Sequence, residues 1–125
     1  MSVQTNQYLI YGVSLPYTFS KEWEKQTGKD FYETFEDFMD DSAFSRQVNH
    51  KDGIFCLFDG MSGRYIVIGR VIEKGDDDDP FIAVGEPLSF DSMCNGDQQA
   101  VKESIERNFG IQEAELKYWL ITHYR

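Results

Sequence analysis

Hydrophobic residues gather in five short stretches that predict β-strands. Residues 8–15 (YLIYGVSL) and 64–74 (RYIVIGRVIEK) are apolar at both odd and even positions, which is typical of interior strands buried on both faces. Residues 54–58 (IFCLF) lead into residues 64–74 through DGMSG, whose glycines allow a tight turn, so the two stretches predict a β-hairpin. Residues 114–125 predict a final strand, and residues 81–84 (FIAV) a short edge strand.

Two helices are predicted from the residues at their ends. Ser20 can cap a first turn and Gly28 can end a helix in the left-handed conformation, which predicts a helix over residues 21–27. Asp97 is the expected N-cap of another helix over residues 98–109. The apolar row of this helix and the glycine expected to end it are Val101, Ile105, Phe109 and Gly110.

The segment KDFYETFEDFMDDS has the cleanest helical periodicity in the chain. At about 100° per residue its aromatic residues fall on one side and its acidic residues on the other, which predicts an amphipathic helix with an acidic outer face. Like charges four residues apart, such as Glu33 and Asp37, weaken such a helix by roughly a few tenths of a kcal/mol. The predicted core-facing residues are Phe31, Tyr32, Phe35, Phe38 and Met39.

The predicted order is strand, helices, strand, strand, helix, strand in a single domain, residues 1–125. This order favours the α+β class, with a mainly antiparallel sheet and about three helices on one face. The ferredoxin-like βαββαβ arrangement has this order and a centre formed by its first and third strands, which agrees with the two continuously apolar stretches. Residues 1–7 are expected to form a flexible tail, and residues 75–80 a mobile acidic loop.

Aromatic residues of the predicted strands suggest that the sheet face opposite the helices is apolar. Such a face is too hydrophobic to remain in water, so we expect a second copy of the chain to cover it, giving a homodimer. The candidate dimer-interface residues are Tyr8, Tyr11, Tyr65, Tyr118 and Trp119.

Composition indicates a globular protein of the reducing cytoplasm. A chain of 125 residues, 15% of them aromatic, can build one hydrophobic core without disulfide staples. The two cysteines form no CxxC motif, and the first residues lack the basic start and apolar run of a secretory signal. No apolar stretch approaches the roughly 18 residues that a membrane helix requires, so no membrane partner is expected.

The net charge of −10 is concentrated in two segments. Residues 30–41 carry six acidic residues and no basic one, and residues 73–97 carry eight acidic residues and one lysine. These segments sum to −6 and −7, so the rest of the chain is +3. The negative potential is therefore expected to be directional, and direct binding to nucleic acid is not expected of such an acidic chain.

The acidic segments have three interpretations. The loop GDDDDP (75–80) lacks the spacing of a calcium loop, so neither a metal nor a cofactor is expected, and a solvated loop is the simplest reading. Carboxylates along a helix could instead imitate a phosphate backbone and occupy the basic surface of a partner, such as a host nucleic-acid-binding protein. The candidate partner-binding residues are Glu33, Glu36, Asp37, Asp40, Asp76, Asp77, Asp78 and Asp79.

Catalytic chemistry finds little support in the sequence. A cysteine nucleophile would need Cys56 or Cys94 beside His50 or His123, and only Cys94 precedes a helix N-terminus that would favour a thiolate. The segment GMSGRYIVIG lacks the lysine and the strand-to-helix context of a phosphate loop. We therefore predict no catalytic residue.

Three stretches, YLIYGV, FDGMSGRYIVIGRVI and ELKYWLITHYR, resemble parts of small uncharacterised acidic proteins encoded by bacteriophages. The resemblance covers most of the chain and implies an accessory gene product acting in the host bacterial cytoplasm, where acidic proteins that bind and block host factors are frequent. It implies no catalytic residue, because the group has no assigned activity.

The leading prediction is a non-enzymatic interaction protein that offers its acidic helix face and aspartate loop to a basic partner. One alternative is a small enzyme or ligand-binding protein with a pocket at the sheet or the dimer interface. A second alternative is a structural component of a virion.

Overall fold

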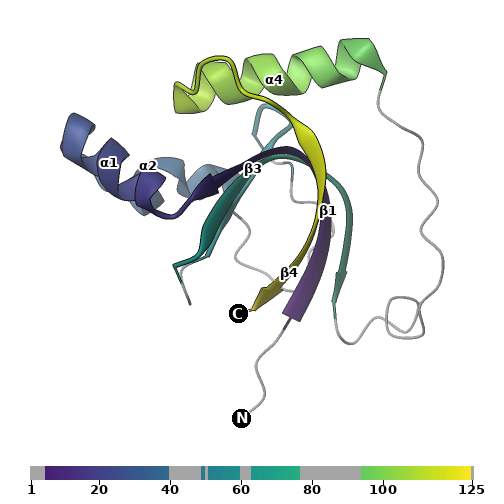
Figure 1. The fold of residues 1–125 in the computed structure, drawn as a ribbon, viewed down its shortest axis with the longest axis horizontal. Helices are drawn as coiled ribbons and strands as arrows, with labels where there is room; N and C mark the ends of the chain where they lie inside the picture. Colours follow the sequence, from purple (N-terminus) through teal and green to yellow (C-terminus); the bar gives the residue numbers. More distant parts are fainter. Residues whose placement is uncertain (1–4, 40–48, 50, 60–62, 77–93, 125) are drawn as a thin grey trace.

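A four-stranded antiparallel sheet forms the centre of the molecule (Figure 1). The computed structural model describes residues 5–39, 49, 51–59, 63–76 and 94–124. The strands follow the order β2-β3-β1-β4, so the first and third strands are central, as predicted from their continuous apolar sequences. The α+β prediction is confirmed. The strands are β1 (Thr5–Pro16), β2 (Phe55–Phe58), β3 (Tyr65–Asp76) and β4 (Lys117–Tyr124).

The central strands extend further than their apolar residues suggested. β1 begins at Thr5, so residues 5–7 of the expected tail pair with β4. β3 continues to Asp76 and thus includes the first two residues of the expected loop at 75–80. The predicted edge strand at 81–84 lies outside the described residues.

The central strands bend together into an arch (Figure 1). Gly12 of β1 and Gly69 of β3 are direct partners in the register. A Cβ atom at Gly12 would overlap the carbonyl oxygen of Ile68, and one at Gly69 would overlap that of Tyr11. The pair therefore permits a close approach of two backbones that no larger residue would allow.

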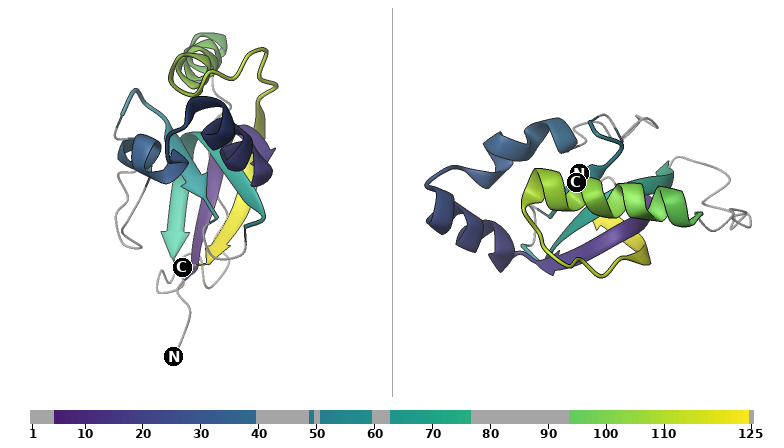
Figure 2. Two further views of the ribbon diagram at one scale, coloured as in Figure 1. Left: turned by 90° about the vertical axis from the view of Figure 1, so that its left-hand side faces the viewer. Right: turned by 90° about the horizontal axis from the view of Figure 1, so that it is seen from above.

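The helices lie together on one side of the sheet (Figure 2). They are α1 (Thr18–Thr27), α2 (Phe31–Phe35), the 3-10 helix η1 (Glu36–Phe38) and α4 (Asn95–Phe109). Gly28 and Gly110 end α1 and α4 in the left-handed conformation, as predicted.

Both predicted N-caps are wrong, because each helix begins earlier. Ser20 lies buried inside α1, where its hydroxyl donates a hydrogen bond to the carbonyl of Tyr17. Cys94 caps α4, and its Sγ accepts a hydrogen bond from the N–H of Asp97 at 3.4 Å.

The predicted amphipathic helix is wrong in its continuity, although its buried side is correct for four of the five residues. Phe35 has φ −109° and ψ 16°, so α2 ends there and continues as η1. The like charges four residues apart disfavour a longer α-helix, and the tighter turn brings both Phe35 and Phe38 against Phe109. Tyr32 remains 45% exposed.

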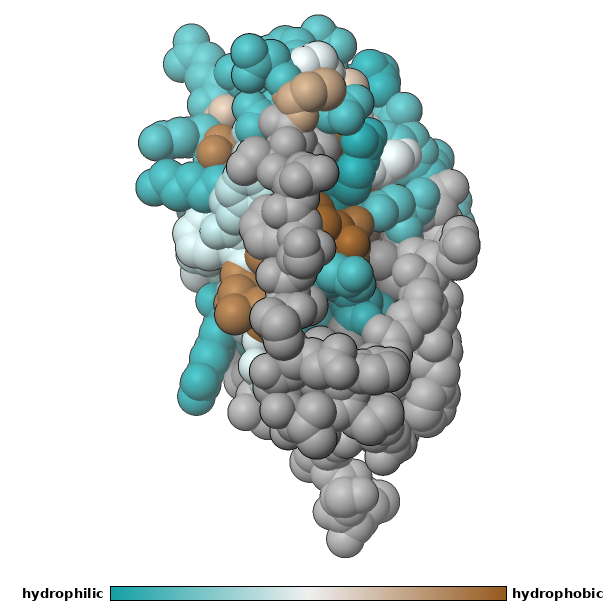
Figure 3. Space-filling view, turned by 90° about the vertical axis from the view of Figure 1, so that its right-hand side faces the viewer, coloured by the Kyte–Doolittle hydropathy of each residue, from teal (hydrophilic) through white to brown (hydrophobic). Residues whose placement is uncertain are grey.

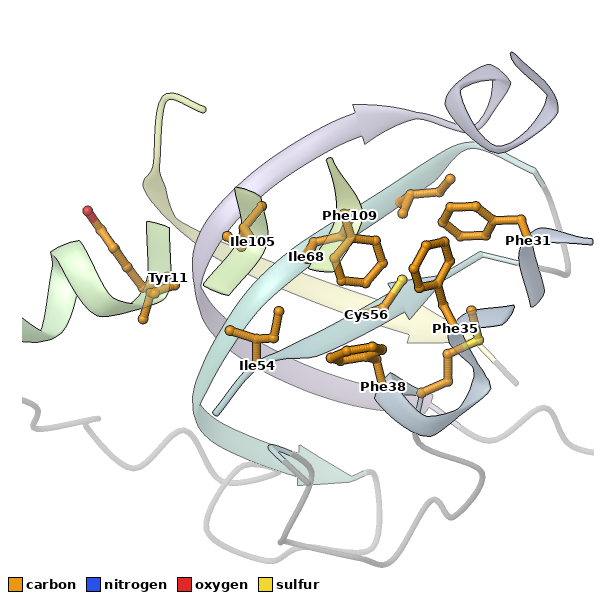
Figure 4. Packing of buried hydrophobic residues seen from close by; sticks show 12 residues of the cluster. Tyr11, Phe31, Phe35, Phe38, Ile54, Cys56, Ile68, Ile105 and Phe109 are labelled. Atoms are coloured by element: carbon orange, nitrogen blue, oxygen red, sulfur yellow. The ribbon is translucent and has the colours of Figure 1, made fainter. Parts of the chain in front are cut away.

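Hydrophobic clusters occupy both faces of the sheet. The cluster on the helix side joins α2, η1, α4 and the strands, and its phenylalanine rings gather where α2, η1 and α4 meet (Figure 4). Among the described residues, the other cluster contains only strand residues. Its buried members are Tyr8, Ile10, Phe55, Leu57, Val67 and Val71.

The five aromatic residues proposed for a dimer interface do not share one face. Tyr11 and Tyr118 belong to the helix-side cluster, with ring centroids 4.9 Å apart, whereas Tyr8, Tyr65 and Trp119 belong to the opposite one. Successive strand residues point to opposite faces, which separates Tyr8 from Tyr11. Tyr8 is fully buried within a single copy, so the reasoning that required a second copy does not hold for it.

The described surface offers no broad hydrophobic patch on the side where α4 begins. In Figure 3 the coloured part of this side is mostly hydrophilic, with hydrophobic residues in small separate areas. None of the helices in the described ranges combines the length and apolarity needed to cross a membrane.

Candidate functional site

Three carboxylates project outward from α2 and η1, and we call them the acidic segment: Glu33, Glu36 and Asp37. All three are exposed. Asp30 begins this region as the N-cap of α2, where its Oδ1 accepts a hydrogen bond from the N–H of Glu33 at 2.9 Å. The acidic segment therefore follows a properly capped first turn.

The side of α2 and η1 opposite the acidic segment is locked into the core. Phe31, Phe35 and Phe38 are 1%, 6% and 3% exposed. Trp23 of α1 contacts Phe31 and Phe35, with ring centroids 5.5 Å and 5.0 Å apart. The N–H of Phe31 also donates to Glu24 Oε2 at 2.9 Å, which ties α2 to α1. The carboxylates are thus presented from a fixed backbone.

The charge of the acidic segment is only partly compensated. Lys51 Nζ lies 3.8 Å from Asp37 Oδ2 and 5.1 Å from the centroid of the Phe38 ring. Both charged side chains of the pair are more than half exposed, so the pair contributes little to stability. Glu33 and Glu36 form no ion pair with any described residue. Among the described residues, the negative charges of Glu33 and Glu36 are therefore not compensated.

The other five predicted partner-binding residues do not belong to the acidic segment. Asp76 ends β3. Asp40, Asp77, Asp78 and Asp79 lie outside the described residues. The structure thus places three of the eight predicted side chains, and all three belong to one turn rather than to a long helical row.

A cavity of about 330 Å³ lies beneath the N-terminal half of α4, and sequence reasoning missed it. Its helical wall consists of polar side chains, those of Asn95, Gln98, Gln99 and Lys102. Its opposite wall is formed by Tyr11 of β1 together with Ala114 and Leu116, which precede β4.

The buried end of the cavity is formed by Tyr11, which is 9% exposed. Its side chain extends away from the phenylalanine rings of the core (Figure 4). No described residue forms a hydrogen bond with its hydroxyl. Burial, and secondarily the neighbouring Tyr118, raise the pKa of Tyr11, so its phenol stays protonated at neutral pH.

One flank of the buried row of α4 carries a signal that could have revealed the cavity. The buried row consists of Val101, Ile105 and Phe109, as predicted. Beside it, Gln98 and Lys102 are polar and half-buried. Polar residues next to a buried row are candidates for function.

The C-terminal half of α4 is anchored by Asp52, in the turn before β2. The carboxylate of Asp52 accepts hydrogen bonds from Arg107 and from Asn108 Nδ2, and its carbonyl accepts one from the hydroxyl of Ser104. The bonds from Arg107 and then Asn108 lower the pKa of Asp52. This cluster holds the C-terminal half of α4 to the turn before β2.

The candidate nucleophiles are placed apart. Cys56 is buried in the helix-side cluster, and burial raises the pKa of its thiol far above the ordinary value, so it behaves as a small hydrophobic residue. Cys94 is an exposed cap of α4. His123 belongs to β4, and His50 lies outside the described residues. In the parts of the chain that the structure covers, no three His, Cys, Asp or Glu side chains converge as metal ligands.

No protein-family model, curated protein sequence or solved structure matches the chain. The resemblance to bacteriophage accessory proteins therefore stays a prediction.

Proposed function

We propose that the chain is a non-enzymatic interaction protein that presents the acidic segment to a basic surface of a partner protein. The observation that carries the proposal is the arrangement of Glu33, Glu36 and Asp37, which are exposed on the outer side of a turn whose inner side is buried in the core. The proposal places the protein in the host bacterial cytoplasm, with support from the bacteriophage resemblance alone.

Fixing the carboxylates before binding favours association. A partner that docks on a preordered turn does not have to immobilise that backbone, so less of the interaction free energy is lost to ordering. Exposed carboxylates also attract a basic surface during the encounter, and this attraction weakens as salt rises because the screening length falls. The single turn of acidic residues fits a compact cluster of Lys and Arg.

Charge reversal tests the proposal. The variant Glu33→Lys, Glu36→Lys, Asp37→Lys should keep the fold, because all three side chains are exposed. In affinity capture from bacterial lysate, followed by identification of eluted proteins, wild type should retain a set of basic proteins at low salt and lose it at raised salt. The variant should lose the same set at low salt.

A matched control separates local recognition from net charge. The variant Glu103→Lys, Glu113→Lys, Glu115→Lys also reverses three exposed carboxylates, and in both variants three changes of +2 move the net charge from −10 to −4. The control should retain the captured set. Equal losses in both variants, or unchanged capture by the first, would contradict the proposal.

A further inference from the structure

The cavity beneath α4 contains polar groups that the fold itself does not use. The Tyr11 hydroxyl has no hydrogen-bond partner among the described residues, and it is not one of the fully buried side-chain atoms. It therefore faces the space of the cavity, where a ligand or water can complete its bonding.

Lys102 gives the cavity its sign of charge. Among the described residues that line the cavity, it is the one with a charged side chain, in a chain whose net charge is −10. It is half-buried and forms no ion pair with any described carboxylate. Asp97 lies on a different side of α4 from Lys102, because residues five positions apart on a helix point in different directions. A positively charged group therefore lines the cavity.

The remaining lining groups add donors on one wall and apolar surface on the other. Gln98 and Asn95 lie on the same helix face as Lys102 and carry amide N–H groups. Gln99 is already engaged, since its Nε2 donates to Glu103 Oε1 at 3.2 Å. Ala114 and Leu116 present aliphatic surface opposite the amides. Donors around one end and an apolar wall suit a molecule with an anionic head and a small hydrophobic body.

From this geometry we propose that the cavity binds a small organic oxyanion, a carboxylate or a phosphate monoester with a compact apolar group. Lys102 and the Tyr11 hydroxyl donate to the oxyanion, and Leu116 and Ala114 contact the apolar group. A volume of about 330 Å³ lies at the small end of the roughly 300–1,000 Å³ range of ligand pockets. The site is separate from the acidic segment and does not depend on the proposed interaction.

Calorimetric titration of the full chain at low ionic strength tests this site. The probes are phenyl phosphate, benzoate and the neutral benzyl alcohol. The two anions distinguish a phosphate from a carboxylate preference, and at least one should bind saturably with a millimolar Kd. Benzyl alcohol should bind at least about tenfold more weakly, because it lacks the charge that strengthens hydrogen bonds from Lys102.

Variants locate the binding. Lys102→Met should weaken the preferred anion about tenfold or more and Tyr11→Phe about three- to tenfold, whereas Lys102→Arg should restore most of the affinity. Lys25→Met, which removes an exposed lysine on α1, should bind as wild type does. The site is overturned by absence of saturable heat with both anions, by equal binding of benzyl alcohol, or by equal losses in Lys102→Met and Lys25→Met.

Discussion

The acidic segment and the N-terminal half of α4 belong to helices on the same sheet face, yet they use their inner and outer sides in opposite ways. On α2 and η1 every core-facing position is aromatic, so the charged groups can act only outward. On α4 the core-facing row is filled by apolar residues, and the polar row beside it, which includes Gln98 and Lys102, lines a cavity. The difference shows that polar groups beside a buried row face an inward site, whereas charged groups opposite a buried row face outward.

Removing a core phenylalanine beneath the acidic segment should have the largest effect on stability. Phe35 is 6% exposed and contacts Phe109, Trp23 and Phe31, so Phe35→Ala should lower the free energy of unfolding by about 3–5 kcal/mol. Urea denaturation followed by circular dichroism measures the change.

The outward side of the same helix gives the control for that experiment. Glu33→Ala removes an exposed side chain without an ion pair among the described residues and should change stability by no more than about 0.5 kcal/mol. A loss below about 1 kcal/mol for Phe35→Ala would show that the aromatic row does not hold the acidic segment in place.

Filling the cavity at the N-terminal half of α4 should change both stability and ligand binding. Gln98→Leu places an apolar side chain at a half-buried position of α4 that lines the cavity. It should raise the free energy of unfolding by about 0.5–2 kcal/mol, while weakening binding of the oxyanion. The matched control is Gln112→Leu at an exposed position, with an expected change within about 0.5 kcal/mol. Destabilisation by Gln98→Leu would instead assign its amide a structural role.

The Asp52 anchor predicts a smaller, pH-dependent effect. Hydrogen bonds from Arg107 and Asn108 lower the pKa of Asp52 in the folded protein. Its contribution is therefore present above the ordinary aspartate value of about 3.9 and is lost as pH falls through the lower folded value. Asp52→Asn should be less stable than wild type at neutral pH, and the difference should shrink in strong acid.

A second variant tests the cause of this pKa shift. Arg107→Gln removes the largest cause, so the Asp52 carboxyl should titrate closer to its ordinary value. Carbon-detected NMR of the side-chain carboxyl measures this value. A constant stability difference between wild type and Asp52→Asn across the acid range would show that the carboxylate charge is not what anchors α4.

Local signals in the sequence were sufficient for most of the fold. Continuous apolar character identified the two central strands, and Gly28 and Gly110 marked two helix ends, because each depends on nearby residues alone. The break of the amphipathic helix at Phe35 depends on Phe109, a residue distant in sequence. The start of α4 depends on a thiol acting as a cap, which is a weak signal next to Asp97.

The acidic segment could be predicted from the sequence, whereas the cavity could not. The outward direction of Glu33, Glu36 and Asp37 follows from helical periodicity and was predicted. The cavity requires Tyr11, Lys102 and Leu116 to meet from three separate parts of the chain, and periodicity does not give that distance. Only the polar residues beside the buried row of α4, Gln98 and Lys102, indicated it.

The opposite directions of the two regions can be tested in a single NMR titration of the wild-type protein. Amide shifts would be recorded first with a short oligolysine peptide and then with phenyl phosphate. The peptide should perturb residues 33–37 more strongly than Glu103, Glu113 and Glu115, and phenyl phosphate should perturb residues 95–102 and Tyr11. Equal responses of all exposed acidic residues to the peptide, or one shared set of responding residues for both probes, would contradict the division into an outward and an inward site.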